Sequence, residues 1–339
     1  MEEGKIKFRS ACRSLLQKAV RRGSGHLTQK AASCLEEIGD FDWLTKRTAI
    51  ITFEENWPLG AELGRISTPE NTSLALMRAT RSVKDKGATG LGTLALALSA
   101  GDLSVLSGES KDHPIIVVAE AIKRPSDFWQ WAANKCSQEC QRMLVETAHR
   151  AYQRGGWPWD RAFMQAAAYL AVTEGVPSAH LSQQHEEAFP LWVALDKHTP
   201  QGKQAIHEAA WQFSISWQQL AWVSFYCESA LTNESTTSSW WLKEIQWRLG
   251  QVSLTYDQAQ TLWDRVRPVL IGMLEFETDA LERYINLPRQ AGQHQLDFLN
   301  EALYRSKTNT APVIATHTDQ TGQPDGNSAS LEPIQLELF

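Results

Sequence analysis

Apolar residues recur at helical spacing along most of the chain, and this periodicity restricts the fold more than any other feature. In the segment 5–22, for example, Phe8, Cys12 and Leu15 fall on one face of a helix. No alternating run of apolar and polar residues is long enough to predict a sheet. The stretch 113–119 fits a buried strand or a buried helix, and the lack of neighbouring strand signals favours a helix. The sequence therefore predicts an all-α protein, with further helices over 28–38, 42–53, 68–83, 91–100, 126–153, 160–174, 186–195, 203–214, 217–230, 239–249 and 257–284.

The composition changes at about residue 306. From there to Pro333 the chain is dominated by Thr, Asn, Gln, Asp, Gly and Pro. Such a segment cannot bury enough apolar surface to offset the entropy lost on ordering. An apolar cluster then closes the sequence. We therefore predict three parts, which are a helical body over 1–305, a disordered tether over 306–333 and a short docking peptide over 334–339.

Composition and charge indicate a cytoplasmic protein. The chain has five cysteines, an odd number without the spacing of a disulfide framework, which is typical of a reducing compartment. The N-terminal region has no apolar signal-peptide core, and no uncharged apolar run approaches membrane-spanning length. The net charge of −6 disfavours a generally basic protein that coats DNA, although it is compatible with a local basic face.

Tryptophan is unusually abundant, with 14 copies among 339 residues. Tryptophan buries a large apolar area and finds a partner for its N–H, so we expect most copies in the core or at a subunit interface. Stacking on nucleic-acid bases is the alternative role.

The last five residues read Gln335-Leu336-Glu337-Leu338-Phe339. Three of them are apolar and follow a polar segment, so they expose apolar surface to water unless a receptor covers it. In a preformed apolar groove the glutamine would supply the polar contacts that fix the register. A tether would hold the body near that receptor at a high effective concentration. The alternative is that the peptide folds back onto its own body.

This Gln-Leu-x-Leu-Phe pattern resembles the pentapeptide by which bacterial polymerases, mismatch-repair proteins and other clients dock on the sliding clamp, the beta subunit of the DNA polymerase. Glu337 stands at the variable position. The resemblance implies that Leu336, Leu338 and Phe339 fill the clamp pocket, beside Gln335. It also implies that the protein works at replicating or repaired DNA, in association with the nucleoid.

Four stretches of the body carry a second resemblance through their shared order. They read LQKAVRRG (16–23), TKRTAIITFEE (45–55), QAAAYLA (165–171) and LDKHTPQGK (195–203). Together they resemble the helical C-terminal region of the RarA/MgsA type of AAA+ replication-associated ATPases. In that family the region forms a helical collar and drives tetramer formation. The resemblance implies a collar-like body that forms a homo-oligomer.

The ATPase module of that family has no counterpart in this sequence. A phosphate loop needs Gly-x4-Gly-Lys-Ser/Thr, whose backbone N–H groups hold the phosphates. The nearest imitation, Gly202-Lys203, has Lys197 in place of the first glycine and Gln204 in place of Ser or Thr. We therefore expect no ATP hydrolysis and no cofactor, and any motor would be a partner ATPase. No other catalytic motif is recognisable, which favours a non-catalytic role.

The basic segment at the start of the body is the candidate for DNA contact. No acidic residue occurs between Lys5 and Arg22. Phosphate contacts from such a helix are sensitive to salt and independent of base sequence. A solvated helix face, or an interface with acidic neighbours, is the alternative. The DNA-contact candidates are Arg9, Arg13, Lys18, Arg21 and Arg22.

Two other groups of polar residues are candidates for catalysis. Asp196, His198 and Lys203 form a polar cluster, but they lack an activated nucleophile, and a capped loop explains them equally well. Glu54 and Glu55 are interpreted as a solvated pair at a helix end.

Glycine-rich and cysteine-containing motifs receive structural interpretations. The glycines over 87–92 lack the spacing of a nucleotide loop and are interpreted as the turn entering a helix. Cys136 and Cys140 are four residues apart on the predicted helix 126–153 and are interpreted as packed thiols, because nothing nearby completes a metal site. We predict no metal site.

The function predicted from sequence is a replication or repair accessory protein docked on the sliding clamp. Its partners would be the clamp, DNA, and an ATPase or polymerase. Two alternatives are a clamp-anchored DNA-processing enzyme, for example in base excision, and a mobile-element or phage protein that targets the clamp.

Overall fold

The computed structural model describes residues 2–63, 69–106, 113–182, 191–195, 200–230 and 238–286. Its contacts divide the chain into one unit of Lys7–Leu287 and a second of Met1–Ile6 with Pro288–Phe339. The fold described below is that of Lys7–Leu287. The predicted tether and docking peptide lie outside the described residues.

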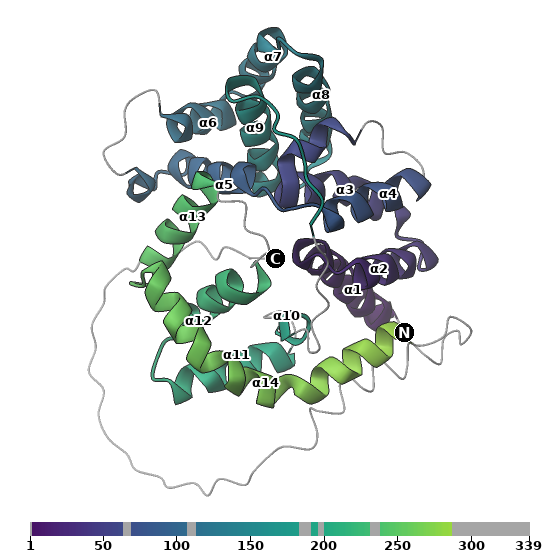
Figure 1. The fold of residues 1–339 in the computed structure, drawn as a ribbon, viewed down its shortest axis with the longest axis vertical. Helices are drawn as coiled ribbons and strands as arrows, with labels where there is room; N and C mark the ends of the chain where they lie inside the picture. The colour runs from purple at the N-terminus through teal and green to yellow at the C-terminus, as the bar shows by residue number, and fades with distance from the viewer. Residues whose placement is uncertain are drawn as a thin grey trace, which may run out of the picture. The chain divides into compact units, whose positions relative to one another are not determined.

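Within the described ranges all regular structure is helical, which confirms the all-α prediction (Figure 1). Two isolated bridges, Asn56 with Asp85 and Ser82 with Leu181, are the extended pairings found there. The helices up to residue 135 are α1 (Glu2–Arg22), α2 (Gly25–Glu37), α3 (Phe41–Asn56), the 3-10 turn η1 (Trp57–Ala61), α4 (Pro69–Arg81), α5 (Gly87–Ser99), η2 (Leu103–Val105), α6 (Pro114–Lys123) and α7 (Pro125–Lys135).

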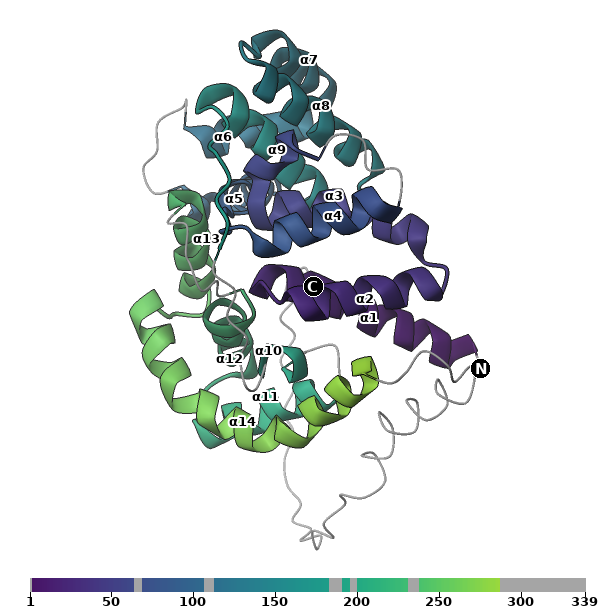
Figure 2. The same cartoon turned by 45° about the vertical axis from the view of Figure 1, so that its right-hand side comes forward.

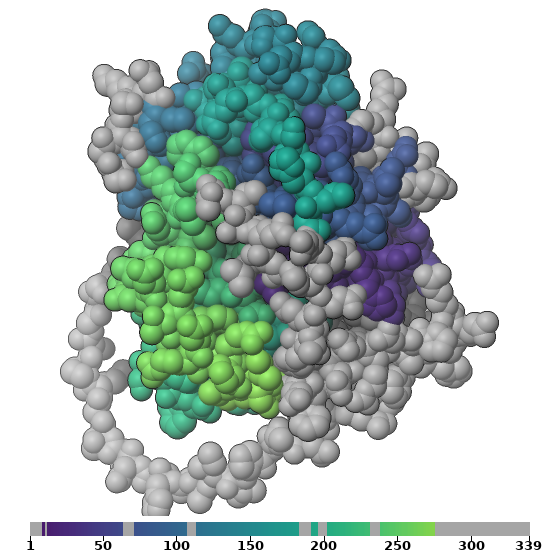
Figure 3. All heavy atoms as spheres, in the orientation of Figure 1, coloured from purple at the N-terminus to yellow at the C-terminus, as the bar shows by residue number. Residues whose placement is uncertain are grey.

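The remaining helices include one short π turn and end on a helix that contains Pro268. They are α8 (Glu139–Arg154), α9 (Pro158–Thr173), α10 (Leu191–Ala194), α11 (Pro200–Gln212), α12 (Trp217–Ser224), the π turn η3 (Phe225–Ser229), α13 (Ser239–Gly250) and α14 (Tyr256–Asn286). Helices α10 and α11 pack against α14, and both α13 and α14 reach the surface shown in Figure 3.

Helix α3 lies between two apolar cores. Phe53 belongs to a core built mainly from α5 to α9, whereas Leu44 and Ile51 belong to a core shared with α1, α2 and α4. Two views of the ribbon show α3 and α4 between the α1–α2 pair and the α5–α9 group (Figures 1 and 2). Because apolar partners cover it on both sides, nearly all of α3 from residue 47 onward is buried.

Small residues let α5 approach its neighbours closely. A Cβ atom added to Gly90 would meet the backbone of Trp240 and would lie 2.6 Å from the backbone nitrogen of Trp241 in α13. A Cβ atom added to Gly92 would lie 2.9 Å from the ring of Phe163 in α9. The glycines interpreted as a helix-entry turn are thus part of α5 itself and are contact points between helices.

The sequence favours a helix over 113–119, and the structure confirms it, since α6 begins at Pro114 and His113 caps it. The single helix predicted over 126–153 is wrong. Helix α7 ends at Lys135, and α8 begins at Glu139. The side-chain oxygen of Gln141 accepts hydrogen bonds from the backbone N–H groups of Ser137 and Gln138, at 2.9 and 3.0 Å. This side-chain cap stabilises a break that no glycine or proline announces.

Two neighbouring expectations are also corrected. Cys136 caps α7 while Cys140 belongs to α8, so they do not share a helix. Cys136 packs against the core built mainly from α5 to α9, although both thiols are partly exposed. The α-helix predicted over 217–230 ends at Ser224 and continues as η3.

The tryptophans divide between core and surface. Five copies are buried, fewer than the majority expected in the core, and these are Trp57, Trp129, Trp192, Trp222 and Trp263. Six more are partly buried, namely Trp43, Trp131, Trp159, Trp240, Trp241 and Trp247. The exposed copies are Trp157, Trp211 and Trp217, and Trp211 exposes 83% of its surface. In the described part of the chain, none of the helices has the length and apolar character needed to cross a bilayer.

The contact between α5 and α13 gives a first test. Gly90→Ala should destabilise the fold by about 1–3 kcal/mol, because the new methyl group meets backbone that cannot move aside. Gly272→Ala is the matched control, since nothing lies within 4 Å of its added Cβ atom in α14. It should stabilise the protein by up to about 1 kcal/mol through helix propensity. Urea unfolding measures both, and equal effects would contradict the close approach.

Candidate functional site

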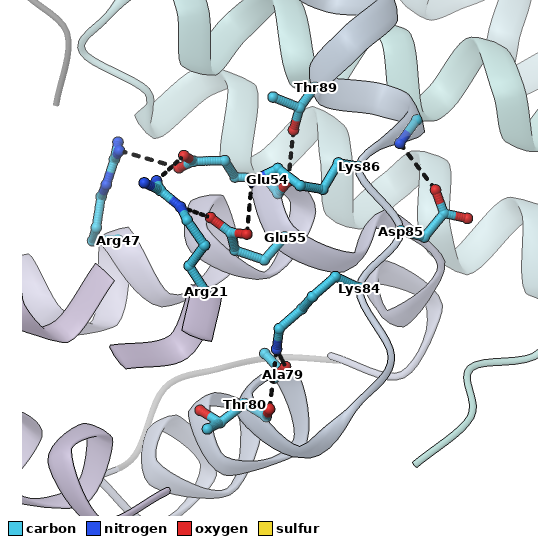
Figure 4. Close-up of polar contacts among 11 residues, drawn as sticks. Arg21, Arg47, Glu54, Glu55, Ala79, Thr80, Lys84, Asp85, Lys86 and Thr89 are labelled. Atoms are coloured by element: carbon cyan, nitrogen blue, oxygen red, sulfur yellow. Dashed lines mark hydrogen bonds and ion pairs between the residues drawn. The ribbon is translucent and has the colours of Figure 1, made fainter. Parts of the chain in front are cut away.

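The centre of the described unit holds a buried cluster of six charged side chains. Three are cationic, Arg21, Arg47 and Lys86, and three are anionic, Glu54, Glu55 and Asp160. We call this set the central ion cluster (Figure 4 shows all but Asp160). Each of the six is less than 10% exposed. Buried charges are tolerated only when they are paired and hydrogen-bonded.

Arg21 at the end of α1 connects both glutamates of α3. Its Nε donates to Glu55 Oε1 at 2.6 Å, and its Nη2 donates to Glu54 Oε1 at 2.9 Å. Lys86, at the start of α5, donates from Nζ to Glu55 Oε2 at 2.8 Å. Both oxygens of Glu55 are therefore satisfied by cations from two different elements.

Arg47 extends the cluster to α9. Its Nη1 donates to Asp160 Oδ1 at 2.7 Å, and its Nη2 lies 3.7 Å from Glu54 Oε2. The Thr89 hydroxyl donates to the backbone carbonyl of Glu54 at 2.6 Å. Glu54 and Glu55 lie at the C-terminal end of α3, where the helix dipole is already negative, so their charges are unfavourable there. The three cations of the cluster offset this repulsion.

Opposing effects set the pKa of Glu55. Burial pushes that pKa upward, but Lys86 and Arg21 outweigh burial and hold the pKa at about 2. Burial likewise lowers the basicity of Arg21, but Glu55 and Glu54 reverse the effect and raise the pKa of the guanidinium. Glu55 and Arg21 therefore remain ionised at neutral pH.

The segment between α4 and α5 runs extended beside the cluster and is held on both sides. The backbone N–H of Val83 donates to the His180 carbonyl at 2.9 Å, and that of Asp85 donates to the Glu55 carbonyl at 3.0 Å. Asn56 Nδ2 donates to the Val83 carbonyl at 2.6 Å. These bonds explain the two isolated bridges and fix the positions of the side chains on this segment.

Lys84 and Lys86 on this segment reach different partners. Lys84 Nζ donates to the carbonyls of Ala79 and Thr80 at the end of α4, the second at 3.0 Å (Figure 4). Burial lowers the pKa of Lys84 to about 7. Attraction by Glu55 opposes this decrease, whereas repulsion by Lys86 adds to it. Both lysines are buried and serve as anchors for this connection.

A second group of polar side chains, buried except for the partly exposed Arg267, joins the π turn to its neighbours. The Tyr226 hydroxyl donates to Glu244 Oε1 at 3.1 Å, and Arg267 Nε donates to Glu228 Oε2 at 3.0 Å. Arg22 Nη1 donates to the Glu228 backbone carbonyl at 2.8 Å. Burial raises the pKa of Glu244 to about 7.

An open pocket of about 530 Å³ adjoins the extended segment on the side of Asp85. Its wall includes Trp57, Glu174, Ser238 and Trp240. Two acidic side chains and two indoles are therefore brought together at a solvent-accessible place. The described residues contain no group of three or more His, Cys, Asp or Glu side chains arranged to hold a metal ion.

The five residues predicted to contact DNA lie in two different environments. Arg21 and Arg22 are buried in the contacts above, and Lys18 is buried with its Nζ 3.5 Å from the Leu195 carbonyl. Arg9 and Arg13 stay partly exposed, with 43% and 32% of the side chain accessible.

Both accessible arginines face the same acidic residue. Arg13 binds Asp40 through two hydrogen bonds of 2.7 Å, and Arg9 lies 3.8 Å from it. Contact with DNA by Arg9 and Arg13 stays a prediction.

The remaining candidates can also be placed. Glu54 and Glu55 are buried, so the interpretation of a solvated pair is wrong, because cations from α1, α3 and α5 surround them. Lys203 is exposed on α11, while Asp196 and His198 lie outside the described residues. Gln335, Leu336, Leu338 and Phe339 also lie outside them.

Two of the four sequence stretches quoted above contribute residues to the central ion cluster. Arg21 belongs to LQKAVRRG, and Arg47, Glu54 and Glu55 belong to TKRTAIITFEE. Asp160 lies five residues before QAAAYLA on the same helix. The signal that sequence reasoning missed was the presence of charged residues inside otherwise apolar helices, whose partners lie far away along the chain.

Comparison with known proteins adds no relative, since no protein-family model, curated protein or solved structure matches this chain.

The ion cluster gives a second test. Glu55→Gln should destabilise the protein at pH 7 by about 3–5 kcal/mol, because Arg21 and Lys86 lose a buried partner. The Glu55 pKa is lower in the folded protein, so its contribution is present above pH 4.5 and is lost as the pH falls toward 2. The difference from wild type should therefore shrink over that range.

Glu120→Gln is the control for Glu55→Gln. It removes a carboxylate that is paired with Lys123 on the surface. Surface pairs contribute little to stability, so this variant should unfold like wild type. Denaturant unfolding at pH 7 and pH 3 measures both variants, and a Glu55→Gln effect that is small at pH 7 or constant with pH would contradict the cluster.

Proposed function

We propose that this protein is a replication or repair accessory protein that docks on the bacterial sliding clamp through Gln335, Leu336, Leu338 and Phe339. The observation that carries the proposal is the Gln-Leu-Glu-Leu-Phe sequence itself. Its apolar side chains suit a preformed groove, and its glutamine supplies directional polar contacts. Short peptides of this kind bind through a few anchors whose spacing sets specificity.

The composition of the chain supports a separate docking element. Residues 306–333 are dominated by Thr, Asn, Gln, Asp, Gly and Pro and cannot bury enough apolar surface to offset the entropy lost on ordering. In the proposal the helical unit Lys7–Leu287 is the body that the peptide brings to the clamp. The tether raises the effective concentration of this body at the clamp.

For the body we propose a collar-like, self-associating role without catalysis of its own. The resemblance to the AAA+ collar region supports it, and the residues that carry the resemblance stabilise the centre of the fold. Exposed Trp211 and Trp217 are apolar surface suited to a subunit or partner contact. The partner would be an ATPase or a polymerase, and the protein would work in the cytoplasm at the nucleoid.

DNA contact is proposed for Arg9 and Arg13 alone among the basic residues of α1. Both are partly exposed near the middle of the helix, where phosphate oxygens can compete with Asp40 for the guanidinium groups. Such contacts release counterions and carry no base preference.

The docking proposal predicts a specific mutational pattern. Leu336→Ala and Phe339→Ala should each weaken binding to purified clamp by at least about tenfold, because each removes an apolar anchor. Glu337→Ala, at the variable position, is the matched control and should bind like wild type. Surface plasmon resonance on immobilised clamp measures all three, and wild-type affinity after truncation behind Pro333 would refute the proposal.

The DNA proposal makes a separate prediction. Affinity for a short duplex should fall linearly on a log–log plot against salt, and Arg9→Gln with Arg13→Gln should lower the slope by roughly two. Lys123→Gln with Arg124→Gln removes the same charge from the exposed end of α6 and should leave the slope unchanged. Fluorescence anisotropy measures binding, and equal slopes for the two double variants would contradict the assignment.

A further inference from the structure

The pocket beside the extended segment is built from parts that are far apart in sequence. Trp57 comes from η1, Asp85 from the connection between α4 and α5, and Glu174 from the end of α9. Gln138 at the start of α8 and Ser238–Trp240 at the start of α13 complete this part of the wall. Its volume of about 530 Å³ falls within the range of small-molecule sites, roughly 300–1,000 Å³.

Two carboxyl groups face this space, and each is oriented by an indole. Asp85 Oδ1 accepts a hydrogen bond from the Gly87 backbone N–H at 2.9 Å, and its carboxyl group also accepts one from the Trp57 side chain. The Trp240 side chain donates to Glu174. Since a carboxylate has about four acceptor positions, each retains capacity for a donor from a ligand.

Neither Asp85 nor Glu174 has a cationic partner among the residues of the pocket wall. Burial raises the pKa of Asp85 despite its two donors. Burial also raises the pKa of Glu174. The hydrogen bond from Trp240 opposes this increase, whereas repulsion by Asp85 adds to it. No lysine or arginine lines the pocket. A ligand that donates hydrogen bonds would relieve this repulsion.

The start of α13 has backbone donors that need acceptors, whereas the two carboxyl groups are acceptors that need donors. Ser238 precedes the first turn but makes no side-chain cap hydrogen bond, and both Ser238 and Ser239 line the pocket. The first N–H groups of a helix are donors with a partial positive charge. The pocket thus places two acceptor side chains beside the start of α13 and the partly exposed indole of Trp240.

We propose that this pocket binds a single nucleobase that carries an exocyclic amino group. Asp85 and Glu174 accept from the amino group, as acidic side chains do from the N4 amino group of cytosine. The α13 start donates to the acceptor atoms of the base, and Trp240 covers part of its ring. A planar ligand with both donors and acceptors matches this wall better than a simple anion, which the two carboxyl groups would repel.

The base can come from single-stranded DNA or from a free nucleoside, and the recognition chemistry is the same. For DNA as the source, the inference rests on the proposed role at replicating or repaired DNA. The base would then have to leave its stack to enter a pocket in the body.

The experiment titrates the full chain with cytidine, uridine and ribose and follows tryptophan fluorescence. Cytidine should bind at least about tenfold more tightly than uridine, because uridine places a carbonyl where cytidine has its amino group. Asp85→Asn and Glu174→Gln should each weaken cytidine binding by about tenfold. Glu146→Gln removes a carboxylate from the exposed face of α8 and should bind like wild type.

Equal binding of cytidine and uridine, equal quenching by ribose, or no binding of any of them would overturn the proposal. Ser239→Leu tests it independently of the acidic residues, since it places a larger side chain at an exposed position of the pocket wall and should abolish cytidine binding. Retained affinity in this variant would also overturn it, and circular dichroism confirms that each variant is folded.

Two further arms identify the source and separate this inference from the docking proposal. Short oligothymidylate with one central deoxycytidine should outcompete plain oligothymidylate if DNA is the source, whereas cytidine binding without that preference indicates a free nucleoside. Clamp binding by the pocket variants should be unchanged, because the pentapeptide is intact. Loss of clamp binding in Phe339→Ala with cytidine binding retained shows that the two sites are independent.

Discussion

Arg21 bridges the carboxylates of Glu54 and Glu55, and the rest of the helical unit depends on this interaction. Helix α3 lies between two apolar cores, so its carboxylates cannot reach water. Two buried carboxylates at the negative end of a helix would be strongly destabilising alone. Arg21, Arg47 and Lys86 neutralise them and, in doing so, connect α1, α5 and α9 to α3. The same charges that fold the chain also fix the extended segment from which Asp85 faces the pocket.

The sequence predicts the helical class well because apolar periodicity is a local property. It fails where a side chain replaces the usual signal, as at the break between α7 and α8, where Gln141 caps the helix without glycine or proline. It also fails where burial depends on distant elements. Nothing near Glu54 or Glu55 in the sequence shows that Arg21 and Lys86 will surround them, and so the sequence predicts a solvated pair. The pocket escaped prediction for the same reason, because its wall joins residues from Trp57 to Trp240.

The proposed functions are distributed over different parts of the chain. The pentapeptide is proposed to choose the clamp, and the pocket is proposed to read a base at the body. Of the basic residues of α1, Arg21, Arg22 and Lys18 stabilise the fold, while Arg9 and Arg13 remain at the surface. A basic helix can therefore stabilise a core and contact a polyanion with different residues.

The central functional claim is that residues 335–339 are sufficient to bind the clamp. The most direct measurement is the affinity of a synthetic peptide of residues 331–339 for purified clamp, compared by calorimetry with that of the full chain. If the anchors alone carry recognition, the two dissociation constants should agree within about threefold. A peptide that fails to bind at concentrations where the full chain saturates the clamp would contradict the claim and place the docking surface in the helical body.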